Sequence, residues 1–110
     1  MKVRTLTAQT DFQTVYEQGL KQVSKSFVLF WLPAEREFRY AVVASRKTIG
    51  IAVKRNRAKR LLRELLHLTL VSTDKLQGNL VLVARAELLK GNFANLKAEL
   101  GKCLKNWQLV

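Results

Sequence analysis

The chain has 110 residues, of which 48% are hydrophobic, and 20 Lys and Arg stand against 8 Asp and Glu, so the formal net charge is +12. This length and apolar content predict one domain, residues 1–110, with a packed core, and they exclude a disordered tail. Such an excess of positive charge is relieved by a polyanion, which makes nucleic acid the first candidate partner and a membrane surface the second. A generically basic protein without a polyanionic partner is the plain alternative.

The first half of the chain predicts one helix and two strands. The helix runs from Thr10 to Gly19, and three apolar residues share one of its faces: Phe12, Val15 and Tyr16. Ser26 to Leu32 alternates apolar residues on both faces, which indicates a strand covered on both sides. Pro33 to Arg36 predicts a turn and Phe38 to Ser45 a returning strand, so we expect the two strands to form an antiparallel hairpin.

The second half predicts a long helix from about Ile51 to Leu70, a short strand from Asn79 to Ala84 and a last helix capped by Asn92. The buried stripe expected on the last helix has six members: Phe93, Leu96, Leu100, Cys103, Leu104 and Trp107. The order is therefore helix, two strands, helix, strand, helix. It predicts an α/β fold of the two-layer α+β type, in which helices pack on one small mixed sheet.

Cys103 is the only cysteine, which excludes an intrachain disulfide and a zinc site built from several thiolates. We expect it to be a small buried apolar residue. This cysteine usage suits a reducing cytoplasm, where we expect the protein to work. No stretch is long and apolar enough to predict a membrane-spanning helix, and we expect no membrane partner.

The long helix carries most of the positive charge on one side. With about 100° of rotation per residue, six polar residues fall within an arc of about 140°: Arg55, Lys59, Arg63, Asn56, His67 and Arg60. The opposite side holds six residues, of which only Thr69 is polar: Ala58, Leu61, Leu62, Leu65, Leu68 and Thr69. Arg57 falls on the border between the two sides. Leu66 and Leu70 lie within the basic arc, which indicates that the second half of the helix is buried on more sides than the first.

The alternative for this helix is an ordinary solvated charged face. A solvated face predicts mixed signs of charge with stabilising Glu–Lys pairs. Here only Glu64 interrupts the run, and like charges four residues apart repel. The uncompensated stripe favours a polyanion, and arginine suits this partner because its planar group can pair two phosphate oxygens or stack on a base.

A set of short motifs surrounds and includes this helix. They are Ser45-Arg46-Lys47, Ile49-Gly50, Ala52-Val53, Arg55-Asn56-Arg57, Lys59-Arg60 and Arg63-Glu64. In this order they resemble the signature of the ribonuclease P protein family, with Thr48 as an extra residue. Phe27 to Phe30 and Val81 to Arg85 are similar to the family's strands before and after the basic helix. The resemblance covers nearly the whole chain, and its most specific part is the Arg-Asn-Arg block.

The resemblance implies the protein subunit of ribonuclease P, a tRNA 5′-maturation endoribonuclease whose active site and Mg²⁺ belong to the RNA subunit. It implies one monomeric protein per ribonuclease P RNA, with precursor tRNA as the substrate, and a rare left-handed crossover around the basic helix. The residues to which it assigns RNA-subunit binding are Arg55, Asn56, Arg57, Lys59, Arg60 and Arg63.

The resemblance also implies a cleft between the first helix and the sheet that holds the single-stranded 5′ leader of precursor tRNA. By position its residues are Phe12, Tyr16, Phe30, Ser45, Arg46 and Lys47. Aromatic rings beside cations suit single strands, because a base stacks on the ring while cations follow the phosphates. The residues alone favour a plain core role for Phe12 and Phe30, whereas Tyr16 suits the surface. Arg46 and Lys47 are alternatively residues that keep a strand end soluble.

No arrangement for catalysis by the protein itself is present. His67, the lone histidine, has no cysteine or clear acidic partner nearby in the sequence. The acidic residues are scattered, and no glycine-rich phosphate loop occurs. We therefore predict no catalytic residue, no metal ligand and no cofactor-binding motif in this chain.

Two other classes of function remain open from the residues. A structural RNA-binding protein of the ribosomal type, without a link to a nuclease, would use a basic helix and a small sheet equally well. A DNA-binding regulator would place the same helix in the major groove, but it usually needs a dimer, and no dimer seam is visible.

Overall fold

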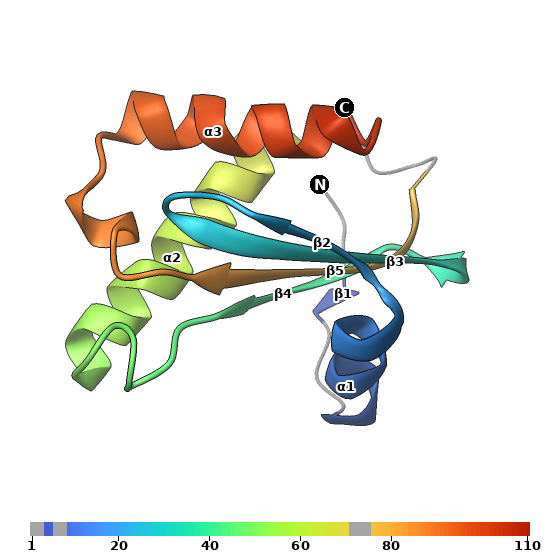
Figure 1. The fold of residues 1–110 in the computed structure, drawn as a ribbon, viewed down its shortest axis with the longest axis horizontal. Coiled ribbons are helices and arrows are strands. Elements are labelled where there is room, and N and C mark those ends of the chain that lie inside the picture. Colours follow the sequence, from blue (N-terminus) through green and yellow to red (C-terminus); the bar gives the residue numbers. More distant parts are fainter. Residues whose placement is uncertain (1–3, 6–8, 71–75) are drawn as a thin grey trace.

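The computed structural model describes residues 4–5, 9–70 and 76–110. Within these ranges the elements in chain order are β1 (Arg4–Thr5), α1 (Gln9–Gln18), β2 (Leu20–Val23), β3 (Phe27–Glu37), β4 (Arg39–Val43), α2 (Ala52–Thr69), β5 (Gln77–Ala84), the 3-10 helix η1 (Leu88–Lys90) and α3 (Phe93–Asn106). Figure 1 shows their arrangement. Every helix and strand expected from the sequence is present in the expected order, and β1, β2 and η1 are additions.

The described strands form one mixed sheet in the order β1-β4-β5-β3-β2. The central strand β5 is parallel to β4 and antiparallel to β3, so the predicted hairpin between Ser26–Leu32 and Phe38–Ser45 is wrong. β5 takes the central place because its run from Leu80 to Leu82 is apolar on both faces and fully buried. Because β3 and β4 are adjacent in the sequence, a direct pairing was expected, but the fold instead buries β5, the most apolar strand, between them.

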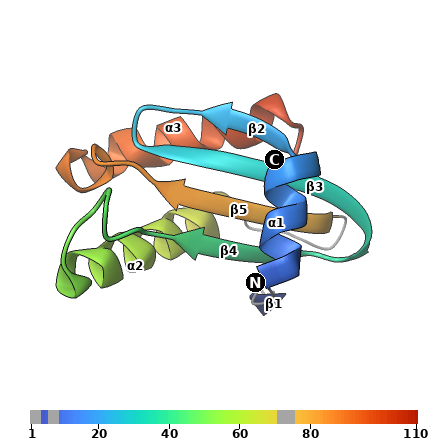
Figure 2. The same cartoon turned by 60° about the horizontal axis from the view of Figure 1, so that its bottom comes forward.

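The predicted turn at Pro33 to Arg36 is also wrong, because β3 continues to Glu37 with a register shift after Pro33. In Figure 2 the end of β3 arcs around the start of β5, and the chain then enters β4 on the other side. Gly78 faces this arc with a φ of +140°, and a Cβ placed on it would lie 2.4 Å from the carbonyl oxygen of Leu32. Only glycine permits so close an approach of the two backbones.

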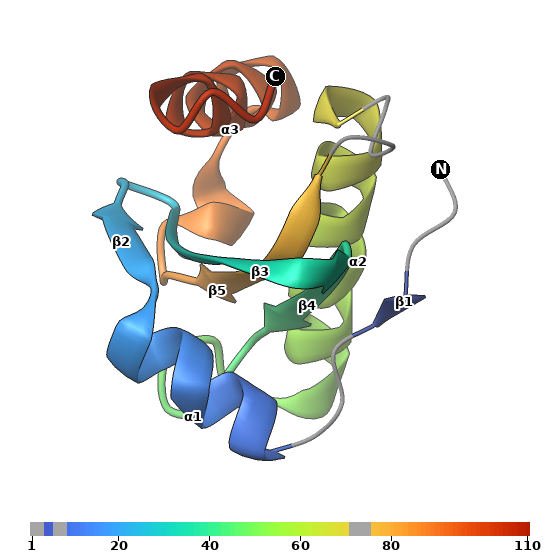
Figure 3. The same cartoon turned by 90° about the vertical axis from the view of Figure 1, so that its right-hand side faces the viewer.

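The connection from β4 through α2 to β5 is left-handed. In Figure 3, where β4 and β5 run away from the viewer, the path from β4 through α2 to β5 turns anticlockwise. Almost all parallel crossovers are right-handed. The rare crossover that the family resemblance implies is therefore present in this chain.

Helices cover the two faces of the sheet unequally. α2 and α3 pack on one face and enclose the larger core, while α1 alone crosses the other face (Figures 1 and 2). None of the helices in the described ranges is long and apolar enough to cross a membrane. The apolar stripe of α2 is buried through Ala58, Leu62, Leu65 and Leu66, but Leu68, which was expected there, is 46% exposed.

α3 is fixed at its start and along its length. As predicted, the side chain of Asn92 caps the helix, with Oδ1 accepting from the backbone N–H groups of Ala94 at 2.8 Å and Asn95 at 3.3 Å. Leu96, Leu100, Cys103 and Leu104 are buried as expected. The prediction fails at the first residue of the helix, Phe93, which is 39% exposed, and Trp107 is only half-buried.

Glu99 ties α3 to the turn between β2 and β3. Its carboxylate accepts hydrogen bonds from the hydroxyls of Ser24 and Ser26 and from the backbone N–H of Ser26. Partial burial raises the pKa of Glu99, but these hydrogen bonds and the nearby Lys25 outweigh it and hold the pKa below its usual value. The bonded form is therefore the ionised one.

The Glu99 contacts lead to a pH-dependent contribution to stability. Because the pKa of Glu99 is lower in the folded than in the unfolded chain, its contribution is full above the unfolded value and is lost as the pH falls through the folded value. Glu99→Gln should lower the free energy of unfolding at pH 7 by about 1 kcal/mol, or the melting temperature by about 4–8 °C. Thermal melts at several pH values check this. A gap between wild type and variant that stays constant into strong acid would contradict it.

Candidate nucleic-acid interface

The basic side of α2 faces solvent over most of its length. Four of the six residues predicted to bind the RNA subunit are exposed: Asn56, Arg57, Arg60 and Arg63. The other two, Arg55 and Lys59, are half-buried at the edge of the leucine stripe, and the Nε atom of Arg55 is buried without a hydrogen-bond partner in the described part of the chain. The structure thus brings all six onto one helix, with the exposed four forming its outer surface.

The charge of α2 is not neutralised from within. Among the side chains that the structure describes, no carboxylate lies within ion-pair distance of the basic groups of α2. The first turn contains no acidic residue, and Ile51 at the N-cap offers no side-chain hydrogen bond. Since a helix N-terminus is itself partly positive, these cations raise the positive potential there further.

Three predicted aromatic residues form one cluster where α1 crosses the sheet. The ring of Tyr16 lies 4.8 Å from that of Phe30 in an edge-on arrangement and 6.3 Å from that of Phe12. Tyr16 is 40% exposed, as predicted, while Phe12 and Phe30 are half-buried and pack against the smaller core of Val15, Ala41 and Val81, so the core role that the sequence favoured is met in part. Partial burial raises the pKa of Tyr16, so its hydroxyl stays protonated near neutral pH.

A cation and a small pocket accompany the aromatic cluster. The ammonium of Lys21 lies 5.7 Å from the centre of the Phe30 ring, within the range of a cation–π contact. A pocket of about 280 Å³ along α1 is lined by Phe12, Gln13, Tyr16 and Glu17. The cluster therefore offers both ring surface and positive charge to solvent.

Beside the cluster, four valines form a row across the sheet, which we call the open sheet face: Val23, Val28, Val43 and Val83. The strand register pairs Val43 with Val83, Val83 with Val28, and Val28 with Val23. α1 packs on the neighbouring row, where Val15 is buried with Ala41 and Val81, and Val43 and Val83 pack against this cluster. In Figure 2 none of the described helices crosses the ends of β3, β4 and β5 beyond α1 on this face. Val23 is 62% exposed and the other three are half-buried.

Cations lie at the far end of the open sheet face. Ser45, Arg46 and Lys47 are exposed and lie in the loop that follows the end of β4 at Val43. The Ser45 hydroxyl accepts a hydrogen bond from the backbone N–H of Thr48 at 3.1 Å, so the extra residue Thr48 is part of a tight turn. In the chain, the 45–47 loop therefore follows the β4 member of the valine row, Val43.

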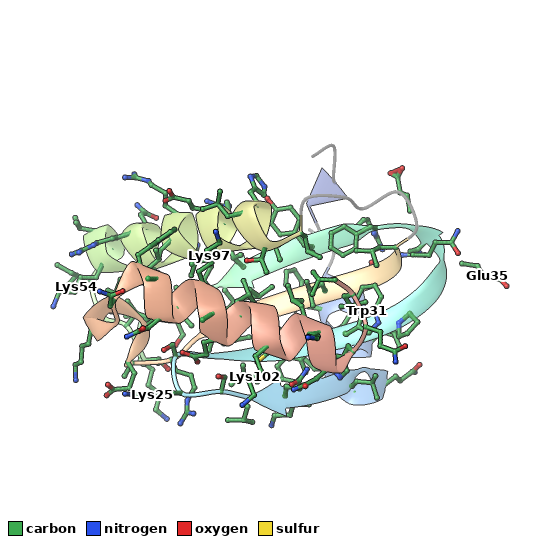
Figure 4. All side chains as sticks on the ribbon, turned by 90° about the horizontal axis from the view of Figure 1, so that it is seen from above. Lys25, Trp31, Glu35, Lys54, Lys97 and Lys102 are labelled. Atoms are coloured by element: carbon green, nitrogen blue, oxygen red, sulfur yellow. The ribbon has the colours of Figure 1, made fainter. Side chains whose placement is uncertain are left out.

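The same end of the molecule gathers cations from several loops. Arg85 follows β5, and its Nη1 donates to the carbonyl oxygen of Ser24 at 2.6 Å. Figure 4 shows Lys25 and Lys54 at this end and Glu35 at the opposite end. The carboxyl ends of the two parallel strands thus share one positively charged end with the start of α2.

Sequence reasoning missed Lys21, Arg85 and the valine row. Lys21 and Val23 belong to β2, which was not predicted, and the row depends on the pairing of β3 with β5. The alternation of Val81, Val83 and Arg85 was the available signal that these three share one face.

The described residues contain no group of three or more His, Cys, Asp or Glu side chains that could hold a metal ion. The exposed guanidinium and ammonium groups can pair with phosphates, and aromatic rings and valines can contact bases and sugars.

Comparisons with known proteins agree with one another. A family model described as Ribonuclease P matches residues 1–108. The ribonuclease P protein component of a Nitratiruptor species is 39% identical over 104 residues, which cover 94% of this chain and 91% of that protein. That of Caldanaerobacter subterraneus subsp. tengcongensis is 32% identical over 109 residues, covering 98% and 92%.

Solved structures share the fold. The RNase P protein of Staphylococcus aureus superposes with a TM-score of 0.81 at 24% identity and covers 98% of both chains. The RNase P protein of Thermotoga maritima gives a TM-score of 0.75 at 24% identity and covers 96% of this chain and 97% of that one. At this identity the likeness shows the fold alone.

Proposed function

Because the chain belongs to the ribonuclease P protein family, we propose that it binds the catalytic RNA through α2 and the 5′ leader of precursor tRNA through the open sheet face, and so promotes removal of the leader by the RNA. The observation that carries the proposal is the row of exposed cations on α2, none of which has a carboxylate within ion-pair distance among the described side chains. Folding leaves this charge uncompensated, and a folded RNA supplies the missing phosphates.

α2 suits RNA better than a simple anion does. Arg57, Arg60 and Arg63 each offer a planar fork that pairs two phosphate oxygens, and their positions span about two turns of the helix. Asn56 is exposed beside them and can both donate and accept, which fits a 2′-hydroxyl or a base edge. Arg55 and Lys59, at the edge of the leucine stripe, then contribute through the ends of their long side chains.

The open sheet face suits a single strand. A leader crossing it meets the Tyr16 ring at one end, apolar valine surface in the middle, and Arg46 and Lys47 at the other end. Stacking on an aromatic ring accepts any base, and cations beside it follow the backbone phosphates. Lys21 and Arg85 add charge along the same path.

In this proposal the chemistry of cleavage belongs to the RNA subunit, together with its Mg²⁺. The protein screens repulsion between two RNAs and adds contacts to the leader. Because cations near the RNA lower the need for screening by salt and divalent ions, the protein's effect should be largest at low Mg²⁺.

The test is reconstitution with a bacterial ribonuclease P RNA. At low Mg²⁺ the chain should raise the rate of precursor tRNA cleavage at least about tenfold, and the complex should bind precursor tRNA better than mature tRNA. A ribosomal-type RNA-binding protein would show no such dependence on the leader. Cleavage by the purified chain alone, or cleavage by the RNA that is the same with and without the chain, would overturn the proposal.

A further inference from the structure

A second surface on α2 is a pocket of about 260 Å³ between the first half of α2 and the segment that leads from η1 into α3. Its lining has two parts. α2 contributes Arg57, Arg60, Leu61 and Glu64, and the other wall consists of Leu89, Gly91, Phe93 and Leu96. Since a water molecule takes about 30 Å³ in the liquid, this volume suits a ligand of many atoms rather than a single ion.

Phe93 is the residue that makes the pocket unusual. It begins α3 and was expected in the buried stripe, yet 39% of its surface is exposed. Its place is well defined, because the Asn92 cap fixes the start of the helix and Leu96, one turn later, is buried. Gly91 packs so closely that a Cβ there would lie 2.8 Å from a methyl group of Leu96. An aromatic ring is thus held at the surface of the molecule.

The two walls carry different chemistry. Phe93, Leu89 and Leu61 provide apolar surface, while Arg57 and Arg60 are exposed and have no carboxylate within ion-pair distance among the described side chains. Glu64 adds one carboxylate to the lining. A ring beside guanidinium groups fits an unpaired nucleotide, whose base stacks while its phosphate meets the cations.

Glu64 restricts which part of the nucleotide enters. A carboxylate repels phosphate, so the phosphate stays with Arg57 and Arg60 and the base lies in the pocket. An ionised carboxylate only accepts hydrogen bonds, and it has two oxygens to do so. Guanine offers two adjacent N–H donors on its Watson–Crick edge and therefore matches this group.

We propose that the pocket binds one unpaired guanine of the catalytic RNA, with the base on Phe93, its donor edge toward Glu64 and its phosphate on Arg57 and Arg60. The inference rests on the proposed binding of the RNA subunit by α2 and extends that interface to the start of α3. The guanine would add a base contact to the α2 interface, whose other proposed contacts are mainly with phosphates.

The first test measures the affinity of the full chain for a bacterial ribonuclease P RNA. Phe93→Leu keeps an apolar side chain in the pocket lining but removes the ring, and it should weaken binding about tenfold, whereas Phe93→Trp, which keeps a ring, should not. Because Phe93 neutralises no phosphate, the salt dependence should be the same for wild type and Phe93→Leu. Wild-type affinity in Phe93→Leu, or a changed salt slope, would overturn the inference.

The second test identifies the base by kethoxal, which modifies unpaired guanines at their Watson–Crick edge. Wild type and Phe93→Trp should protect one unpaired guanine of the RNA, and Phe93→Leu and Glu64→Ala should expose it. Charge alone predicts the opposite for Glu64→Ala, since removing a carboxylate from a basic helix should tighten binding. If no unpaired guanine is protected, or if Glu64→Ala keeps the protection, the pocket does not bind as proposed.

The outcomes separate this inference from the proposed function. Arg63 lies on α2 but does not line the pocket. If Arg63→Ala weakens RNA binding while the Phe93 and Glu64 variants behave like wild type, only the inference of guanine binding is contradicted. If the wild-type chain fails to bind the RNA at all, the proposed function falls with it.

Discussion

Replacing Arg57, Arg60 and Arg63 together by alanine should weaken binding of the ribonuclease P RNA on the order of a hundredfold and make it less sensitive to salt. Each lost phosphate contact removes about 0.7–0.9 from the slope of log affinity against log salt, so three contacts should remove about 2–3. All three side chains are exposed and none contributes to the leucine core, so the fold should survive. Titrations of labelled RNA at four or more salt concentrations give both quantities.

A matched control comes from α3, whose outer surface carries Lys97, Lys102 and Lys105. Changing these three to alanine removes the same charge from a different helix. Generic attraction between a basic protein and RNA predicts equal losses for both triple variants, whereas a specific α2 interface predicts a small loss for the α3 variant. An unchanged salt slope in the α2 variant would remove this helix from the interface.

Tyr16→Ala should lower the preference of the holoenzyme for precursor tRNA over mature tRNA about tenfold, while the affinity for the RNA subunit stays unchanged. The ring is 40% exposed and contacts Phe30 edge-on, so its loss removes a stacking surface without opening the core. Tyr16→Phe is the control, because it keeps the ring and loses only the hydroxyl. Binding of the two tRNA forms to the reconstituted complex gives the ratio.

A second prediction about leader binding concerns the cationic end of the open sheet face. Lys47→Ala should lower the affinity for precursor tRNA and flatten its salt dependence, since Lys47 would meet a phosphate rather than a base. Equal effects of Tyr16→Ala on precursor and mature tRNA would mean that the aromatic cluster does not contact the leader.

Much of the fold follows from local patterns. The leucine spacing of α2, the Asn92 cap and the apolar run of β5 each place an element within about two residues of its bounds, because such signals depend on neighbours in the chain. Strand pairing does not follow from local patterns. β3 and β4 are separated by one residue, Phe38, yet each pairs with β5, because burying the most apolar strand between them outweighs sequence proximity.

The candidate site divides in the same way. The basic side of α2 follows from helical periodicity, so its residues could be predicted from the sequence. The half-buried positions of Arg55 and Lys59 could not, because they depend on how closely the leucine stripe packs against the sheet. The valine row could not be named, since it joins four strands whose order was unknown. Phe93 matched the spacing of a buried stripe, but as the first residue of α3 it stays 39% exposed.

The insertion of β5 between β3 and β4 has a consequence for how the protein is made. Until residue 84 has left the ribosome, β3 and β4 have no shared partner, and each presents a row of unsatisfied backbone groups. The emerging chain can pair β2 with β3 and β1 with β4, but it cannot join these two pairs into one sheet before β5 is available. We therefore expect the sheet to be completed late, when β5 enters between β3 and β4.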